Sequence, residues 1–155
     1  MKTTLAAIAL AAALAPTASA ITFPSLTTIY VGSGVTDSGD AANTGVATSI
    51  HCSNVSGTTV QVRVLILGGI GAVEGALTQS LVHGQTITFS THSTLVFGEG
   101  STLATGPVLQ GVVNVEATNS AVFCSAMIVD AANFTPAFMG PLHLVRVNPH
   151  PGTVE

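Results

Sequence analysis

The sequence predicts an all-β protein, a single antiparallel β-sandwich of about eight or nine strands. Short runs in which apolar and polar residues alternate recur beyond residue 20, and this period of two indicates half-buried strands. Turns rich in Gly, Pro, Asn and Ser separate the runs, and no stretch with the period of a helix lies between them. Many short strands at this spacing are typical of two packed sheets.

The first 20 residues have the pattern of a cleavable signal peptide and are left out of the fold. Lys2 gives a short basic start, residues 5–14 form an apolar segment, and residues 17–20 carry the small-residue pattern that a signal peptidase accepts. The apolar segment is shorter than the roughly 20 residues that a bilayer-spanning helix needs. We therefore expect cleavage before Ile21, no membrane span after cleavage, and a periplasmic or extracellular protein.

Residues 21–155 are expected to form one β-sandwich domain, because no linker or repeat divides them. Two arginines and no lysine oppose seven acidic residues there, a formal charge of −5. Two basic side chains cannot form the positively charged surface that binds the phosphates of nucleic acid. Nucleic acid is therefore excluded as a partner. Charged residues are only 6% of the whole chain. Weak surface charge favours self-association or a cell-surface protein partner, and a monomer with a threonine-rich surface is the alternative.

The strands expected in the first half of the domain are residues 27–31, 46–52, 58–67 and 72–77. Cys52 lies on the more apolar face of its strand, whereas His51 lies on the opposite face. In the strand that follows, Val62 and Val64 alternate with polar side chains. The glycine-rich residues 32–45 are expected to be a long loop.

The strands expected in the second half are residues 84–90, 94–97, 109–117, 120–130 and 142–147. Ile87 and Phe89 alternate with threonine and serine, and Cys124 shares an apolar face with Val122. The same alternation predicts that Glu116 faces solvent.

Residues 64–75 imitate the strand and glycine turn of a dinucleotide-binding site. Glu74 occupies the position of the third glycine and would bring a carboxylate near the phosphates, and no βαβ unit surrounds the segment. We interpret it as a glycine-rich turn between two strands.

The two cysteines, Cys52 and Cys124, are expected to point into the space between the sheets and to form a disulfide. Free buried thiols, a reactive thiol or a metal ligand are the alternatives. Their separation resembles that of the bridge that joins the two sheets of immunoglobulin domains, so we expect an immunoglobulin-like sandwich. The chain departs from that pattern because it has no tryptophan, and its only tyrosine, Tyr30, is not two residues before Cys124.

The histidines allow a test for a cupredoxin-like copper site, with His51, His92 and His143 as candidate ligands. Such sites need a cysteine closely followed by a histidine and usually a methionine. Met127 follows Cys124, but no histidine lies nearby downstream. We therefore predict no metal ion and no cofactor, and ordinary surface or hydrogen-bonding roles for the three histidines.

No motif predicts catalysis, so the chain is expected not to be an enzyme. No serine lies in a G-x-S-x-G turn, and nothing in the sequence brings Glu99 and Glu116 together as an acid and base pair. Asn54 and Asn133 lie in sequons that a eukaryotic secretory pathway could glycosylate.

Three segments, residues 48–54, 103–111 and 142–149, resemble small exported bacterial proteins of unassigned function with an immunoglobulin-like β-sandwich. The resemblance implies a bacterial periplasmic or extracellular protein and carries no catalytic residue. We expect a structural, adhesive or surface-assembly role. In a chaperone-assembled pilin version, residues 21–31 would be a donor strand, although the cysteine spacing and the C-terminal residues do not fit such subunits. The alternative is a periplasmic module that binds a small ligand or a metal ion.

Overall fold

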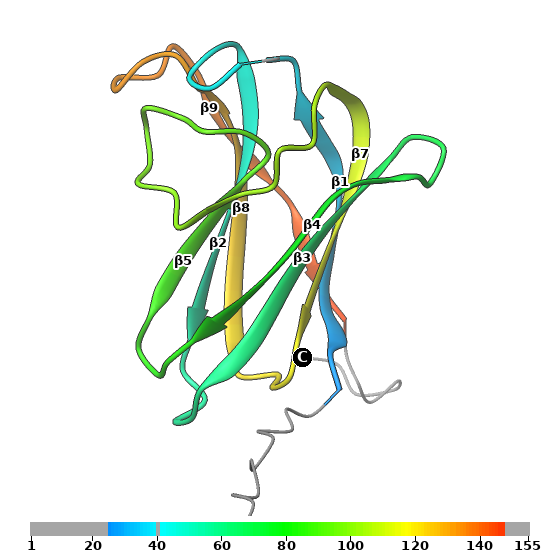
Figure 1. Cartoon of the computed structure of the whole chain (residues 1–155), viewed down its shortest axis with the longest axis vertical. Coiled ribbons are helices and arrows are strands. Elements are labelled where there is room, and N and C mark those ends of the chain that lie inside the picture. Colours follow the sequence, from blue (N-terminus) through cyan, green and yellow to red (C-terminus); the bar gives the residue numbers. More distant parts are fainter. Residues whose placement is uncertain (1–24, 40, 148–155) are drawn as a thin grey trace, which may run out of the picture.

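The computed structural model describes residues 25–39 and 41–147, so the predicted signal peptide, residues 1–20, lies outside the described part. The described residues form strands and no helix (Figure 1). The strands are β1 (Thr27–Asp37), β2 (Val46–Asn54), β3 (Val60–Gly68), β4 (Val73–Leu81), β5 (Thr86–Ser90), β6 (Ser101–Thr102), β7 (Val108–Ala117), β8 (Val122–Asp130), β9 (Met139–Leu142) and β10 (Leu144–Arg146).

Two five-stranded sheets pack face to face, which confirms the predicted β-sandwich. Sheet A has the order β10-β1-β7-β3-β4, and sheet B has the order β6-β5-β2-β8-β9. All pairs are antiparallel except β5 with the two-residue strand β6, which is parallel. The strand count exceeds the expected eight or nine because β6 and β9 are too short to show alternation.

The core lies between the sheets and takes every second residue of the central strands. In β3 the inward side chains are fully or almost fully buried, namely Val60, Val62, Val64 and Ile66. Phe89 and Ile50 meet them from sheet B. Valine and isoleucine fit this position because branched side chains pack well on a pleated surface. The intervening residues of β3 face outward, as the alternation predicts.

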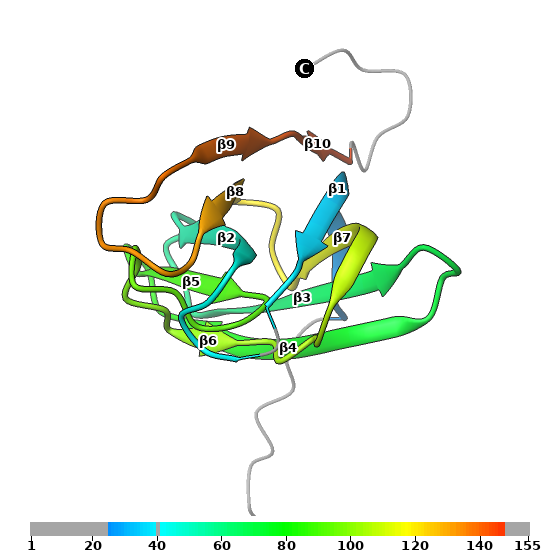
Figure 2. The ribbon, with the colours of Figure 1, turned by 90° about the horizontal axis from the view of Figure 1, so that it is seen from above.

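One side of the sandwich is closed by the segment that leaves β9 in sheet B and enters β10 in sheet A (Figure 2). The sequence predicts one strand at 142–147, whereas the chain changes sheet at His143. Gly32 allows this crossing, because a Cβ atom there would lie 2.8 Å from Leu144 Cδ2 and 2.9 Å from the His143 carbonyl oxygen.

The expected loop at residues 32–45 is wrong in its first part, because β1 continues to Asp37. Gly34 lies in the left-handed region with a φ of 95°, and the register against β7 shifts between Ser33 and Val35. A bulge therefore absorbs the glycine without ending the strand.

The expected strand at residues 94–97 is also wrong, because residues 91–100 form a loop between β5 and β6. Phe97 packs against a second apolar cluster, made by Ala47, Val129, Ala131 and Met127. Ala47 and Met127 lie on the outer face of sheet B, opposite in parity to the core residue Ile50. The apolar residues of the loop thus cover a sheet face instead of forming a ladder.

Cys52 and Cys124 form the predicted disulfide, but it does not join the two sheets. The two residues are direct partners in the ladder between β2 and β8, with Cα atoms 4.2 Å apart. Because β2 and β8 are neighbours in sheet B, the expected inter-sheet bridge is wrong. Cys52 is fully buried in the core and Cys124 packs against it. Alternation therefore predicted the face of each cysteine but not which strands become neighbours.

Candidate functional site

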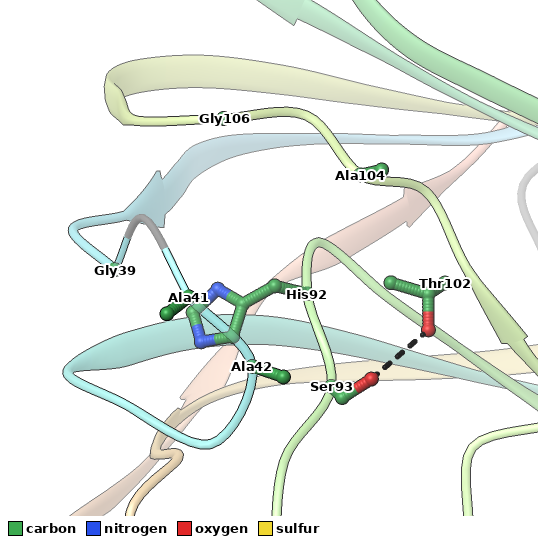
Figure 3. A pocket seen from close by; sticks show the side chains of 8 residues that line it. All are labelled: Gly39, Ala41, Ala42, His92, Ser93, Thr102, Ala104 and Gly106. Atoms are coloured by element: carbon green, nitrogen blue, oxygen red, sulfur yellow. Dashed lines mark hydrogen bonds between the residues drawn. The ribbon is translucent and has the colours of Figure 1, made fainter.

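A cleft of about 390 Å³ opens at one end of the sandwich, where three connections meet (Figure 3). Its walls come from the β1–β2 loop, the start of the β5–β6 loop and the segment before β7. The lining side chains are small or absent apart from His92, Ser93 and Thr102. Ala104, on the rim, adopts a left-handed backbone with a φ of 51°, which is uncommon for a residue other than glycine.

His92 is held at this cleft by both of its ring nitrogens. Nδ1 lies 2.6 Å from Asp37 Oδ2, and Nε2 lies 2.9 Å from the carbonyl oxygen of Thr44. Asp37 is fully buried, and its other oxygen accepts a hydrogen bond from the Gly39 N–H at 3.1 Å. A Cβ atom at Gly39 would collide with Thr44 and lie 2.9 Å from His92 Cε1, so only glycine fits beneath the ring.

The hydrogen bonds fix where the protons of this pair lie. A carbonyl oxygen only accepts, so Nε2 of His92 must carry the hydrogen that it donates to Thr44. One further proton lies between Nδ1 and Asp37, either as an imidazolium facing a carboxylate or as a carboxylic acid facing a neutral ring. In both cases His92 has no nitrogen available to a ligand, so its role is to fasten the loop to the end of β1.

His51 lies on the outer face of sheet B, beneath the loop that contains residues 91–100. Its Nδ1 atom is 3.0 Å from Thr88 Oγ1, and its ring meets the Phe97 ring edge-on, with centroids 4.6 Å apart. Its Nε2 atom is buried without a hydrogen-bond partner in the described part of the chain. Burial lowers the pKa of His51 below the ordinary value of 6.5, and the Glu99 carboxylate opposes this with a smaller effect.

Asp130 fixes the turn that follows β8. Its carboxylate accepts hydrogen bonds from the backbone N–H groups of Ala137 and Ala132, both within 3.0 Å, and from the Asn133 side-chain amide at 2.9 Å. The bond from Ala137 is the largest of the effects that lower the pKa of Asp130 below 3.8, and burial opposes them.

These two groups predict that acid weakens the fold in two separate windows. Below pH 6.5 the unfolded chain binds a proton at His51 more readily than the folded chain, so stability falls until the folded pKa of His51 is passed. Asp130 contributes stability above pH 3.8, and this is lost as the pH falls through its folded pKa. We expect the urea midpoint to fall between about pH 7.5 and 5.5, and the His51→Gln variant to lose most of that fall.

The matched control for this prediction is His143→Gln, because His143 is exposed at the crossing between β9 and β10, away from the β5–β6 loop that covers His51. It should keep the wild-type dependence on pH. A His51→Gln variant with an unchanged slope would show that another group produces the first window.

The structure places the three histidines proposed as metal ligands in three different surroundings. His51 lies under the β5–β6 loop, His92 at the cleft, and His143 is exposed at the crossing between β9 and β10. Within residues 25–39 and 41–147, no three or more His, Cys, Asp or Glu side chains gather closely enough to hold a metal ion. The described residues thus do not bring the copper ligands suggested by the sequence together.

The outer face of sheet A carries a band of mostly apolar side chains, interrupted by Asn114. Across the strands, Val145 pairs with Val31, Val31 with Asn114, Asn114 with Leu65, and Leu65 with Ala76. The next row holds Val112, Leu67 and Val73. Val73, Val112 and Val145 are 62%, 39% and 52% exposed.

Charge on this face is neutralised within the sheet. Arg63 forms an ion pair with Glu116, whose outward orientation confirms the prediction from sequence, and Arg63 Nε donates to Glu116 Oε2 at 2.7 Å. Asn114 donates to the other Glu116 oxygen at 3.1 Å, while its own Oδ1 atom is buried without a partner in the described part of the chain. Two shallow grooves of about 260 and 370 Å³ lie beside Val112.

The two sequons differ in their accessibility. Asn54 is fully buried, and its amide donates to the carbonyl oxygens of Thr58 and Leu81 at 2.7 and 2.8 Å. Both N–H groups are therefore engaged, so Asn54 is not open to a glycan in the folded protein. Asn133 is exposed.

Comparison of the chain with protein-family models, with curated proteins and with solved structures yields no match. In the part of the chain that the structure describes, no helix has the length and apolar character needed to cross a membrane.

Proposed function

We propose that this chain is an exported, non-enzymatic β-sandwich that serves as a subunit of a surface assembly, with a structural or adhesive role. The observation that carries the proposal is the apolar, internally neutralised outer face of sheet A. Apolar surface of this kind on a weakly charged chain is typical of protein contacts.

Three further features support this proposal. The disulfide favours a compartment outside the cytoplasm, since disulfides persist in oxidising surroundings. The resemblance to small exported bacterial proteins implies a periplasmic or extracellular protein of immunoglobulin-like type. At the cleft, the engagement of both His92 nitrogens leaves this histidine no free base.

The pilin version of this proposal is weakened at one point. β1 pairs with β7 on one side and β10 on the other, so residues 27–31 form part of sheet A. They are therefore not a free donor strand in this fold, and residues 21–24 lie outside the described part.

The proposal is tested on residues 21–155 recovered from a secreting host, by intact mass and by light scattering. We expect a mass two hydrogens below that of the reduced chain, and a scattering mass above that of the monomer. Because the proposed contact is apolar, the scattering mass should not fall when salt is raised from about 0.05 to 1 M. A protein that stays monomeric at every concentration would contradict the assembly role.

A small-ligand module is the second candidate, favoured by the cleft lined by His92 and Ala104. Its volume lies in the range of about 300–1,000 Å³ that is common for small-molecule sites. A non-covalent mass that remains on the protein in native mass spectrometry, and that is lost in an Ala42→Trp variant that fills the cleft, would favour this candidate over assembly.

A further inference from the structure

We propose that two copies of this chain pair through β4, which adds antiparallel to β4 of the second copy across a two-fold axis. The two copies of sheet A would then form one continuous sheet of ten strands. This inference rests on the proposed assembly role and names the contact and the partner.

β4 is the longest open strand edge in the described part of the chain. It pairs with β3 on one side and ends the order of sheet A, and no backbone hydrogen bond of the described residues reaches its other side. β10 and β9 are short and are joined by the crossing that closes the opposite side, and β6 has two residues. β4 has nine residues, so it offers a long row of unpaired N–H and C=O groups.

The segment of residues 101–105 packs beneath β4 and not along its open edge. Gln79 donates from Nε2 to Ser101 Oγ at 2.8 Å, and the space beside Gly75 is taken by Leu103 and Thr105. Gly75 and Gln79 share the parity of Leu77, which packs against the core, so these contacts lie on the inner face of the strand. The outer residues of β4 stay exposed.

Beyond its first residues, the edge lacks the features that normally prevent strand addition. Proteins protect such edges with lysine, proline, β-bulges or inward-pointing charge, and the bulge of β4 is confined to its start at Glu74. Residues 21–155 contain no lysine, and the strand VEGALTQSL contains no proline and one charge, Glu74. A Cβ atom added at Gly68 of β3 would collide with the Glu74 carboxyl group. That carboxyl group therefore lies toward β3 and away from the open edge.

The sequence of β4 is compatible with a second copy of itself. Pairing of β4 with its own copy about Leu77 sets the regular stretch Gly75–Gln79 against itself, and the bulge at Glu74 lies outside that stretch. Ala76 then lies opposite Thr78 of the second copy. No like charges meet, and on the inner face Leu77 meets Leu77 of the copy. A two-fold contact of this kind is closed, so it yields a dimer.

The dimer also extends the apolar band on the outer face of sheet A. The row that runs through Val31, Leu65 and Ala76 would continue onto the second copy through its Thr78. The exposed band would then lie on one surface twice as wide, which is the surface that the assembly role needs.

The first test places positive charge on the edge. We expect wild-type residues 21–155 to scatter as a dimer and the double variant Ala76→Lys, Thr78→Lys to scatter with half that mass, because four ammonium groups would meet at the axis. The matched control is Thr86→Lys, Ser125→Lys, which adds the same charge at exposed positions of sheet B and should keep the dimer mass. Circular dichroism checks that all three proteins are folded.

The second test determines which residues of the two β4 strands lie opposite each other. In the native disulfide, directly opposite residues of neighbouring antiparallel strands have Cα atoms 4.2 Å apart. A mixture of Ala76→Cys and Thr78→Cys proteins should therefore oxidise to a covalent dimer between residues 76 and 78, whereas each variant alone should cross-link far less. A mixture of Ala76→Cys with Ser125→Cys is the negative control.

The outcomes separate this inference from the proposed function. If the wild type associates but the lysine pair leaves its mass unchanged and the cysteine mixture does not cross-link, the β4 contact is wrong and the assembly role stands. If the wild type is monomeric throughout, the assembly role itself fails, and the β4 contact with it.

Discussion

Replacing Cys52 and Cys124 together with alanine is expected to lower the free energy of unfolding by about 4 kcal/mol. The bridge closes a loop between residues 72 positions apart, and the loop-closure model assigns about 4 kcal/mol to a loop of that length. The effect arises in the unfolded chain, because the β2–β8 ladder from Val46 to Asn54 holds the two strands together in the native state without the bridge. Urea unfolding of the oxidised wild type and of the double variant measures the difference.

Reduced wild-type protein is the control for packing, because it keeps the sulfur atoms and therefore the volume of the buried Cys52 side chain. It should unfold at nearly the same urea concentration as the double variant. Equal midpoints for oxidised and reduced wild-type protein would contradict a stabilising bridge. If only the alanine variant unfolds at a lower urea concentration, the lost stability comes from the smaller side chains in the core and not from the missing bridge.

The Asp37→Ala variant is expected to lose about 3 kcal/mol, since removal of one partner of a buried pair leaves the other partner unsatisfied. His92 Nδ1 and the Gly39 N–H would both lose the fully buried Asp37 carboxyl group as their hydrogen-bond partner. Thermal or urea unfolding followed by circular dichroism gives the change in stability.

Asp37→Asn distinguishes the two proton arrangements of the pair. The asparagine amide can donate to a neutral His92 ring that keeps its hydrogen on Nε2, so this variant should lose about 1 kcal/mol or less if the native ring is neutral. A loss as large as that of Asp37→Ala would indicate an imidazolium. Ser93→Ala, which lines the same cleft and makes a 3.4 Å hydrogen bond to Thr102, should change stability by no more than about 0.5 kcal/mol.

Local alternation predicted which face of each strand is buried, because the direction of a side chain depends only on its neighbours along the strand. Cys52 faces the core and His51 the outer side, and the glycines between β3 and β4 form a turn as expected. The pairing of strands depends on residues far apart, so the placement of Cys52 and Cys124 within one sheet could not be derived from their spacing. The strand expected at 94–97 failed because its apolar residues cover an outer sheet face.

The candidate sites were harder to find for the same reason. Asp37 and His92 are 55 positions apart and neither lies in a motif, so only the fold brings them together. The sequence carries one signal of the covered face: the outward residues Ala47 and Ser49 of β2 are small and uncharged, which suits a face that a loop covers. The absence of lysine is a property of the whole of residues 21–155, and its importance at the β4 edge follows only from the strand order.

The position of β1 in sheet A determines when folding can finish. β1 is made early, yet Thr27 pairs with Ala117, and Tyr30 pairs with Arg146 on the other side. Neither neighbour exists until most of the chain has been synthesised, so sheet A cannot be completed during translation. Pairing between residues so far apart in the sequence slows folding, and the strands of the growing chain stay unpaired for longer. A chain that entered a narrow channel while it was still being synthesised would therefore carry its first strand through unpaired.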